Sequence, residues 1–447
     1  MEYIVRYSLG VGFIGVVLLM TSVEGQETSK VALTWPGFRG QGNGHASVER
    51  LPVTWEMRGR RSGSWTTRLP GYGQSSPVVW NDTAFVTAVS GDQKERLHLL
   101  AIGLRDGKVR WTRDFDATQR IPDGDAVSRG APTPVVDADR VYAVFESGDV
   151  FAVTHQGEIA WQRSFVKDYG EIKGPHGYAS SPVLAPGTLV LQVAHAGPSY
   201  VLALDTATGQ NRWKVEHPSQ TGWSTPALFE HDGVRGVIVS SSGSVRAYRL
   251  LDGRELWFVS NVRGNSTASP TIVGDAVLIA ASTDREGGGG GGSSGTTVPG
   301  NSRPSVARPG ELGSLVIQLG GNGDVTTTHV RWKSAKVSAG YATPVVEEGL
   351  AYFVSRVGNV QCVDLTDGTI RWQHRLPGSA WASPIVHRGK VFFFCKDGAV
   401  VVLKAGASLE EVGESSLSAT DVVYGVAAVE EAWLVRTGRS LILIKAD

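Results

Sequence analysis

The sequence predicts an all-β protein, an eight-bladed β-propeller of four-stranded antiparallel blades that is closed by its own N-terminal strand. Two short phrases recur along the chain, one built on Ser or Thr before Pro and one built on Gly before Trp. In addition, the two ends of the chain carry complementary parts of one further repeat. A period of about 40–45 residues that holds four short strands is typical of propeller blades.

The first phrase is a small residue, Ser or Thr, Pro and two apolar residues, and it marks the first strand of each unit. It recurs at intervals of 40–57 residues, apart from one interval of 74 residues. Its instances are SSPVV at Pro77, PTPVV at Pro134, SSPVL at Pro182, STPAL at Pro226, ASPTI at Pro270, ATPVV at Pro344 and ASPIV at Pro384.

The second phrase is a polar turn with Gly, followed four residues later by Trp, and it marks the fourth strand. Gly adopts a positive φ at little cost, which suits a tight turn between the third and fourth strands. Apolar segments such as RVYAVFES and DVFAVT predict the second and third strands. We expect the repeat tryptophans to pack between adjacent blades. The regular instances are Gly107/Trp111, Gly157/Trp161, Gly209/Trp213, Gly253/Trp257 and Gly368/Trp372, and Trp332 follows its turn more loosely.

The two ends of the chain predict how the ring closes. Trp65 lies 12 residues before Pro77, as Trp372 lies 12 before Pro384, so a fourth-strand Trp stands near the N-terminus without a blade in front of it. The C-terminal segment supplies three strands, with Val426 where Pro is expected, and ends before a Trp strand. We therefore expect the strand around Trp65 to complete the last blade, which removes exposed sheet edges.

The N-terminus predicts export. A positive end with Arg6, an apolar run of about 12 residues and a small-residue stretch ending at Gly25 are typical of a secretory signal. The run is shorter than the roughly 20 residues that a membrane span needs, although an uncleaved N-terminal anchor is an alternative. The predicted layout is a signal peptide at 1–25, an N-terminal extension at 26–64 and the propeller at 65–447. Within it, the Gly-rich insertion at 284–313 has the composition of a flexible loop, with a lid as the alternative.

Composition excludes several classes of function. The 43 Lys and Arg residues balance 43 Asp and Glu residues, so the chain lacks the basic footprint that nucleic-acid binding requires. Two cysteines cannot form a disulfide framework, a zinc finger or an iron–sulfur site. Cys362 and Cys395 lie 33 residues apart and are expected to be buried small hydrophobes, with a bridge between neighbouring blades as the alternative. We expect a monomer without a transmembrane segment in the mature chain.

The segment VLALDTATGQNRW, from Val201 to Trp213, resembles the pyrroloquinoline-quinone-type propeller repeat. That repeat occurs in quinoprotein alcohol dehydrogenases and in the outer-membrane protein assembly factor B family, and the resemblance covers nearly the whole mature chain. The opening WPGFRGQGNGH (35–45) and LPVTW (51–55) further resemble a group of exported bacterial propeller proteins of unsettled function. We expect this motif to pin the extension to the propeller, with a ligand site as the alternative.

The resemblance to quinoprotein dehydrogenases implies adjacent cysteines over the quinone, a calcium held by Glu and Asn, and an Asp base. The sequence has no vicinal cysteine pair and no CxxCH haem motif. It also has no HExxH, nucleophile elbow, Walker loop or carboxylate cluster at metal-ligand spacing. We therefore expect no cofactor and no metal, and pyrroloquinoline quinone with calcium is the alternative.

The candidate binding residues lie in the loops before the repeat prolines, which should ring the entrance of the central channel. Aromatic residues with an Arg make good interface anchors, and exposed rings would form a platform for an extended peptide or a flat ligand. The alternative is that they plug the channel mouth. The candidates are Gln74, Trp223, Tyr341 and Trp381 at three residues before Pro, Tyr178 at four before it, and Arg129 and His176 from the two longest loops.

The predicted function is therefore a non-catalytic scaffold, exported to the periplasm or cell envelope, that binds an envelope protein or peptide. The resemblance to assembly factor B-type proteins implies a role in outer-membrane protein assembly. The alternative is a quinone-binding dehydrogenase or sensor, and a carbohydrate-binding or carbohydrate-acting propeller is a third possibility, for which the sequence shows no paired carboxylates.

Overall fold

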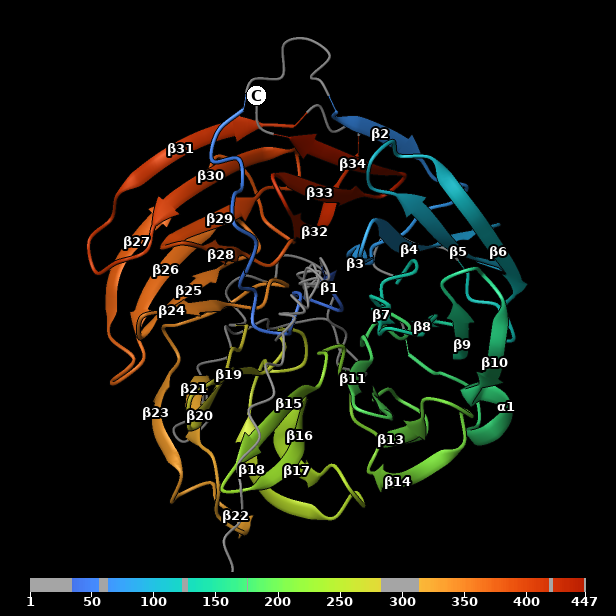
Figure 1. The fold of residues 1–447 in the computed structure, drawn as a ribbon. Coiled ribbons are helices and arrows are strands. Elements are labelled where there is room, and N and C mark those ends of the chain that lie inside the picture. Colours follow the sequence, from blue (N-terminus) through green and yellow to red (C-terminus); the bar gives the residue numbers. More distant parts are fainter. Residues whose placement is uncertain are drawn as a thin grey trace, which may run out of the picture. The chain divides into compact units, whose positions relative to one another are not determined.

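Eight antiparallel sheets stand around a central channel, in chain order, in the computed structural model of this protein (Figure 1). The structure describes residues 34–55, 63–122, 128–174, 176–282, 313–417 and 421–445. Within these ranges, the structure has 34 strands and a single five-residue helix, joined by turns and loops. The predicted fold, an all-β propeller with eight four-stranded blades, is confirmed. The predicted signal peptide and nearly all of the Gly-rich insertion lie outside the described residues.

The first four blades follow the first four Ser/Thr-Pro phrases, and two of them gain a fifth strand from elsewhere in the chain. Blade one comprises β1 (Thr34–Trp35), β3 (Val78–Trp80), β4 (Thr83–Ser90), β5 (Arg96–Gly103) and β6 (Val109–Asp116). Blade two comprises β7 (Val135–Val136), β8 (Arg140–Val144), β9 (Asp149–Thr154) and β10 (Ile159–Ser164), followed by α1 (Phe165–Tyr169). Blade three comprises β11 (Val183–Ala185), β12 (Thr188–Val193), β13 (Ser199–Asp205) and β14 (Asn211–His217). Blade four comprises β15 (Ala227–His231), β16 (Val234–Ser241), β17 (Gly243–Arg249), β18 (Glu255–Val262) and β22 (Gly323–Asp324).

The remaining four blades bring the ring back to its start. Blade five comprises β19 (Thr271–Val273), β20 (Ala276–Ile279), β21 (Ser314–Gln318) and β23 (Val330–Ser334). Blade six comprises β24 (Val345–Glu347), β25 (Leu350–Val354), β26 (Asn359–Asp364) and β27 (Ile370–Arg375). Blade seven comprises β28 (Ile385–His387), β29 (Lys390–Phe394), β30 (Ala399–Lys404) and β31 (Glu411–Ser416). Blade eight comprises β32 (Val423–Val429), β33 (Ala432–Thr437), β34 (Ser440–Lys445) and β2 (Trp65–Arg68).

Blade eight closes the ring with strands from both ends of the chain, as the sequence predicts. β2 pairs antiparallel with β34, in a register that places Trp65 opposite Leu443 and Arg68 opposite Ser440. The outer strand of blade eight therefore comes from the N-terminal part of the chain and its other three strands from the C-terminal part. This closure pairs the strand edges that an open ring would expose.

Outer-strand tryptophans join neighbouring blades, which confirms the packing predicted for them. Each of six indole N–H groups donates a hydrogen bond to a backbone carbonyl in the turn of the following blade. The apolar ring is therefore buried at the interface while its N–H keeps a hydrogen-bond partner. The turn glycines lie against these rings: a Cβ on Gly209 would stand 2.7 Å from the Trp161 ring. The six bonds are Trp65–Leu104 (2.8 Å), Trp111–His155 (2.8 Å), Trp161–Thr206 (2.8 Å), Trp213–Leu250 (2.8 Å), Trp332–Leu365 (2.7 Å) and Trp372–Gly406 (3.0 Å).

The Ser and Thr residues before the repeat prolines form a hydrogen-bonded chain around the channel. In each link, the backbone N–H of one residue donates to the hydroxyl of its counterpart in the next blade. A polar side chain is therefore required here because the inner loops have no other partner for these buried N–H groups. The links are Ser76–Thr133 (3.0 Å), Thr133–Ser181 (2.9 Å), Ser181–Thr225 (3.3 Å), Thr225–Ser269 (2.9 Å), Ser269–Thr343 (3.0 Å) and Thr343–Ser383 (3.0 Å).

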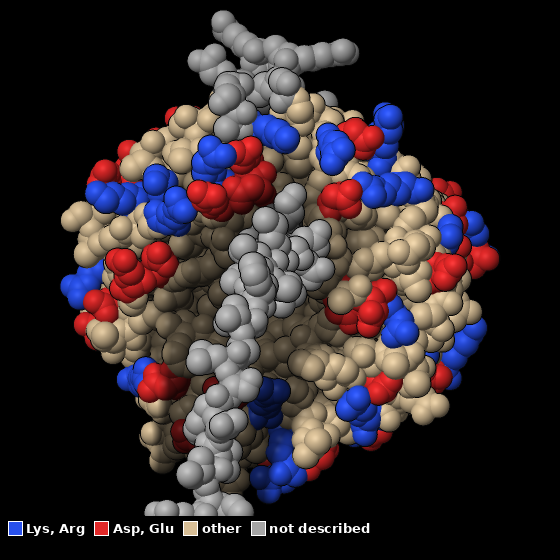
Figure 2. Space-filling view, viewed as in Figure 1, with Lys and Arg blue, Asp and Glu red and all other residues tan. Residues whose placement is uncertain are grey.

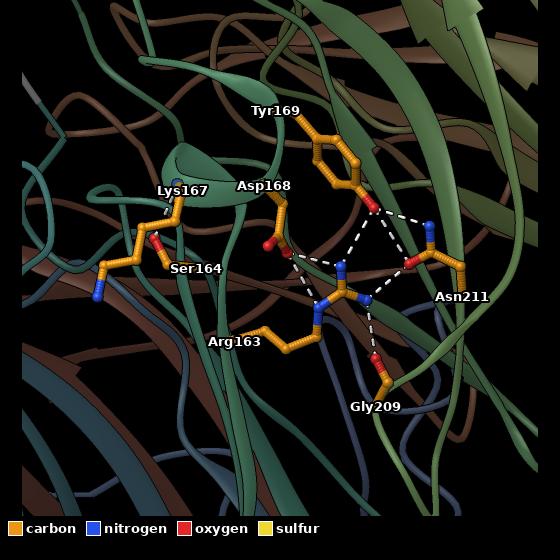
Figure 3. A network of polar contacts seen from close by, with 7 residues as sticks. All are labelled: Arg163, Ser164, Lys167, Asp168, Tyr169, Gly209 and Asn211. Carbon is orange, nitrogen blue, oxygen red and sulfur yellow. Dashed lines mark hydrogen bonds and ion pairs between the residues drawn. The ribbon is translucent and has the colours of Figure 1, made fainter.

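A polar network reinforces the outer edge of blades two and three (Figure 3). Arg163, in β10, donates to the Asp168 carboxylate of α1 at 2.6 Å and to the backbone oxygen of Gly209 at 2.8 Å. It also donates to Asn211 Oδ1 at 2.6 Å, and Asn211 Nδ2 donates to the Tyr169 hydroxyl at 2.7 Å. Because each member is held by another member, we assign this cluster a structural role between blades.

The N-terminal segment 34–55 enters the channel and then crosses one face of the propeller (Figure 1). β1 pairs with β3, and Arg39 is buried among backbone oxygens, with Nη2 2.6 Å from the Pro344 oxygen. Burial lowers the pKa of Arg39 to about 9, which still leaves the side chain charged at neutral pH. His45 hydrogen-bonds to the Val346 oxygen at 2.7 Å. The motif 35–45 thus joins inner strands of blades one, six and seven.

The end of this segment compensates for a missing repeat tryptophan. Gly413 in β31 pairs with Val402 as Trp372 pairs with Cys362 in the preceding blade, so Gly413 occupies the repeat Trp position of blade seven. A Cβ on Gly413 would stand 2.7 Å from Thr54 Cγ2, so the extension fills the space that a Trp side chain fills elsewhere. Trp55 then packs beside it and donates from Nε1 to the Ser416 oxygen at 3.0 Å. The segment LPVTW therefore pins the extension to the propeller, the role predicted for it.

Charges are mixed on the face that segment 34–55 crosses. Figure 2 shows Lys and Arg interspersed with Asp and Glu around the periphery of this face. Among the residues that the structure describes, no helix has the length and apolar character needed to cross a lipid bilayer. Cys362 and Cys395 are both buried free thiols, as the sequence favours, and burial raises the pKa of each to about 11.

Candidate functional site: an aromatic and cationic arc at the channel mouth

The candidate site lies at the end of the channel where the inner strands begin. Two kinds of connection meet there: the loops that lead into the inner strands, and the turns between the second and third strands of each blade. In blade six, for example, Tyr341 precedes β24, whereas Glu347 at the other end of β24 lies 3.7 Å from His45 of the N-terminal segment. The site and segment 34–55 thus contact opposite ends of the inner strands.

Four aromatic side chains form a continuous row across blades six, seven, eight and one. The ring centroids of Tyr341 and Trp381 are 5.1 Å apart, those of Trp381 and Tyr424 are 5.5 Å apart, and those of Tyr424 and Tyr72 are 6.0 Å apart. The planes are inclined by 53–76°, the edge-to-face range that aromatic pairs prefer. We call these four residues the aromatic arc. Tyr341 is 41% exposed and the other three are half-buried.

Basic side chains lie over the rings of the arc. Lys396 Nζ is 4.2 Å from the Trp381 centroid, and the guanidinium of Arg356 is 5.1 Å from that of Tyr341. Arg129 and Arg439 lie 5.1 and 5.6 Å from the Tyr72 centroid. Such cation–π contacts each contribute about 0.5–1 kcal/mol at exposed sites and fix the orientation of the cation.

Three of these cations have no anionic partner. In the part of the chain that the structure describes, the side-chain nitrogens of Arg356, Lys396 and Arg439 make neither a hydrogen bond nor an ion pair. Two acidic residues near them are engaged by backbone: Asp397, in the turn of Lys396, accepts from Ala399 N at 3.2 Å, and Asp421, just before β32, accepts from Val422 N at 2.8 Å. The positive groups therefore remain available to a ligand.

Tyr72 is hydrogen-bonded within the arc and stays protonated. The Tyr72 and Tyr424 hydroxyls are 2.8 Å apart, and Tyr72 also donates to Asp421 at 3.4 Å. Burial, the hydrogen bond with Tyr424 and the nearby Asp421 carboxylate all raise the pKa of Tyr72 far above its usual value. The Tyr72 ring therefore contributes no negative charge at neutral pH.

A buried arginine lies beneath the same part of the arc. Arg436 is fully buried and donates from Nη2 to the Thr87 oxygen at 3.2 Å. Burial lowers the pKa of Arg436 to about 9, and Asp421, Tyr72 and Tyr424 oppose this by favouring the charged form. Because this pKa remains above neutral pH, Arg436 adds a positive charge beneath blade eight, close to the Asp421 carboxylate.

Four of the seven predicted site residues belong to the arc or touch it. Tyr341 and Trp381 are members of the arc. Gln74 and Arg129 are joined by two hydrogen bonds, both 3.0 Å long: Gln74 N donates to the Arg129 backbone oxygen, and Arg129 N donates to the Gln74 side-chain Oε1. This pairing places the Arg129 guanidinium over Tyr72.

The other three predicted residues lie apart from the arc. His176 and Trp223 form a separate pair, with centroids 5.5 Å apart, and Trp223 Nε1 donates to the Gly177 oxygen at 3.0 Å. Tyr178 is only 1% exposed and packs in the core between blades two and three. Its ring therefore forms no part of the exposed rim where the sequence placed it.

Five residues of the site were not found from the sequence: Tyr72, Tyr424, Arg356, Lys396 and Arg439. Tyr424 lies two residues before Val426, in the one blade without a Ser/Thr-Pro marker, and Tyr72 lies five before Pro77. The cations come from the turns between second and third strands. A usable signal existed, because Arg356 and Lys396 both stand two residues before a turn Gly, Gly358 and Gly398.

The channel itself is only partly filled by the N-terminal segment. A cavity of about 400 Å³ remains beside it, on the side of blades two to five. Its walls are mostly apolar, with Phe38 and Trp80 facing Leu184, Leu228 and Ile272.

The two cysteines lie in different blades. Cys362 Sγ contacts the Gly406 oxygen, and Cys395 Sγ contacts the Gly378 oxygen. They therefore do not form the adjacent pair that the resemblance to quinoprotein dehydrogenases implies. Within the described ranges, no group of three or more His, Cys, Asp or Glu side chains gathers as a metal site.

Comparison with known proteins gives one matching family and a wider structural group. The family model of outer membrane protein assembly factor BamB matches residues 62–221, 176–297 and 308–415. Among curated proteins, outer membrane protein assembly factor BamB of Yersinia pestis is 27% identical over 223 residues, which cover 48% of this chain and 51% of that protein. BamB of Escherichia coli K12 is 28% identical over 157 residues, or 34% of this chain and 33% of that protein. The chain thus spans about half the length, or less, of the curated relatives it matches.

Solved structures with the same fold include a BamB protein and dehydrogenases. BamB from Moraxella catarrhalis superposes with a TM-score of 0.57 at 11% identity, covering 86% of this chain and 98% of that one. Quinohemoprotein alcohol dehydrogenase from Comamonas testosteroni gives a TM-score of 0.58 at 12% identity, covering 92% and 80%. A europium-containing methanol dehydrogenase gives 0.61 at 10% identity, covering 92% and 90%. At these identities the likeness concerns the fold alone.

Proposed function

The chain belongs to the family of outer membrane protein assembly factor BamB, and from this premise we propose that it is a non-catalytic propeller that binds a protein partner in the bacterial envelope during outer-membrane protein assembly. The aromatic arc carries the proposal. A row of four contacting rings, one of them 41% exposed, with unpaired cations beside it, has the composition of an interface anchor.

The form of the site favours a macromolecular partner over a small substrate. The arc runs along the rim across four blades instead of converging on an enclosed pocket with an acid or base. The predicted signal at 1–25 supports a location in the periplasm or at the envelope, where assembly partners are accessible. We propose a protein or peptide as the partner, and the monomeric state expected from the sequence stays a prediction.

Site-specific photocrosslinking in cells tests this function. A photoreactive phenylalanine analogue replaces Tyr341 in the exported full chain, and the matched control carries it at Ile159 in the outer strand of blade two, which is 49% exposed. We expect a crosslink to an outer-membrane protein or a component of its assembly machinery at position 341 and none at position 159. Identical crosslinks at both positions, or crosslinks at 341 to no envelope protein, would contradict the proposal.

A quinone-dependent dehydrogenase is the second candidate, because two of the structural neighbours are quinoprotein or methanol dehydrogenases. Titration of residues 26–447 with pyrroloquinoline quinone, with and without calcium, separates the two. Calcium-dependent saturable binding in calorimetry would favour this candidate and direct the next assays to alcohol oxidation. We expect no saturable binding, because the two cysteines are separate buried thiols and not an adjacent pair.

A further inference from the structure

The unpaired cations of the arc specify the chemistry of its ligand. We propose that the arc binds an extended, acidic peptide segment, about five residues long, whose carboxylates pair with Arg356, Lys396 and Arg439 while its apolar side chains pack on the exposed rings. This inference rests on the proposed function and names the partner that the same site selects.

The first step of the argument is charge. Arg356, Lys396 and Arg439 come from three successive blades, and each points its cationic group at the face of an arc ring without an anionic partner among the described residues. A cation held over a ring keeps N–H donors that the ring does not use, since Lys has three donors and Arg five. Groups of one sign along one edge select a partner of the opposite sign and accelerate its encounter.

The second step concerns the neighbouring acidic groups, which form no ion pair with these cations within the described part of the chain. Asp397 follows Lys396 in sequence, yet its carboxylate accepts from the backbone of its own turn. Asp421 is bound by Val422 N and the Tyr72 hydroxyl, and its second oxygen is buried. By contrast, cations elsewhere on this propeller are commonly paired, as Arg212 is with Asp205 at 2.8 Å and Arg371 with Asp364 at 2.6 Å. The lack of pairing at the arc is therefore a local feature.

The third step concerns length and shape. The three centroid steps along the row measure 5.1, 5.5 and 6.0 Å. An extended chain rises ~3.3 Å per residue and repeats its side-chain direction every second residue, at about 6.6 Å. About five residues therefore follow the arc, and every second side chain meets the next ring. A compact ligand would contact only one or two members of this row.

The test is a binding titration with defined peptides on the exported chain without its signal. A fluorescein-labelled peptide in which Glu alternates with Phe and Val is compared with the same peptide carrying Gln or Lys in place of Glu, by fluorescence anisotropy at low and moderate salt. We expect the Glu peptide to bind about tenfold more tightly than the Gln peptide, the Lys peptide not to bind, and the preference to shrink as salt screens the charges.

Matched variants assign the binding to the arc. Lys396→Met removes the cation over Trp381, whereas Lys108→Met removes one from an outer turn, where its side chain is 82% exposed. We expect Lys396→Met to weaken the Glu peptide about tenfold, with Lys108→Met leaving its affinity within about twofold of the original. Equal effects of the two variants, or equal affinity for Glu and Gln peptides, would overturn the inference.

Two further readouts separate this inference from the proposed function and from a lipid ligand. If crosslinking at Tyr341 captures an assembly partner but the Glu and Gln peptides bind alike, the acidic-segment inference fails and the proposed function stands. Vesicles of phosphatidylglycerol serve as the alternative anionic ligand. The inference is overturned if the parent chain binds these vesicles but not the Glu peptide, and Lys396→Met no longer binds the vesicles. The ligand of the arc would then be an anionic lipid surface.

Discussion

Replacement of a turn glycine tests how neighbouring blades fit together. Gly209, between β13 and β14, has φ +72°, and an added Cβ would lie 2.7 Å from Cδ2 and Cε3 of the Trp161 ring in the preceding blade. Gly233, between β15 and β16, has almost the same φ of +73°, but an added Cβ there would meet nothing within 4 Å. Gly209→Ala and Gly233→Ala therefore share the backbone cost and differ in the contact with the tryptophan.

The expected magnitudes follow from this difference. A non-Gly residue in the left-handed region costs roughly 1–2 kcal/mol, which applies to both variants. A contact of 2.7 Å with a ring held by its own hydrogen bond forces a shift of the interface, and such overpacking costs typically about 1–3 kcal/mol more.

Urea unfolding monitored by circular dichroism measures both free energies against the parent chain. We expect Gly209→Ala to be destabilised by about 1–3 kcal/mol more than Gly233→Ala. If the two variants lose the same stability, the turn glycine serves only its own backbone conformation, and the claim that it makes room for the tryptophan is wrong.

Two further predictions concern a buried histidine and the N-terminal segment. Burial, with a smaller effect of Lys173, lowers the pKa of His195 in the folded chain to about 4. In the unfolded chain the same imidazole takes up a proton near pH ~6.5. The folded state therefore loses stability as pH falls from about 6.5 to 4. The melting temperature of His195→Asn should fall less between pH 7.5 and 5 than that of the parent, and an equal fall would contradict the assignment. Trp55→Ala should lower the free energy of unfolding by about 3–5 kcal/mol in urea titrations, because the indole is 6% exposed and hydrogen-bonded to Ser416. A change below about 0.5 kcal/mol, the usual range for surface substitutions, would show that the extension is not anchored there.

The fold could be predicted from the sequence because a propeller repeats one local pattern. Each Ser/Thr-Pro phrase and each Gly-to-Trp spacing reports on contacts with the next copy of the same unit, so the period alone gives the blade. Ring closure was also predictable, since Trp65 has the same distance to Pro77 as Trp372 has to Pro384. The repeat period does not predict the arrangement at Gly413. There, a segment from the distant N-terminus fills the space that a repeat Trp side chain fills in other blades.

The error at Tyr178 has a physical reason that the repeats also display. Residues three before the repeat Pro are at least partly exposed, whereas those four before it are buried in six of the seven repeats, Ser266 being half-buried. Successive side chains of an extended segment point in opposite directions, which explains this alternation. Three of these buried positions are Gly73, Gly222 and Gly340, where an added Cβ would stand within 3 Å of the second strand or its turn. Tyr178 occupies the same inward position, so its ring enters the core. A comparison of residues at this offset would have excluded it.

The binding site could be predicted only in part, because it crosses the seam of the ring. Tyr72 enters the arc from the N-terminal side of the closure and Tyr424 from the C-terminal side, and their hydroxyls meet at 2.8 Å only because β2 pairs with β34. The two tyrosines are 352 residues apart in sequence, so no local spacing relates them. Ring closure and the binding surface therefore depend on each other: whatever opens blade eight removes half of the arc, and a ligand that spans Trp381, Tyr424 and Tyr72 holds the seam closed. Binding of such a ligand should accordingly stabilise the folded chain, by mass action, at the one interface that joins its two ends.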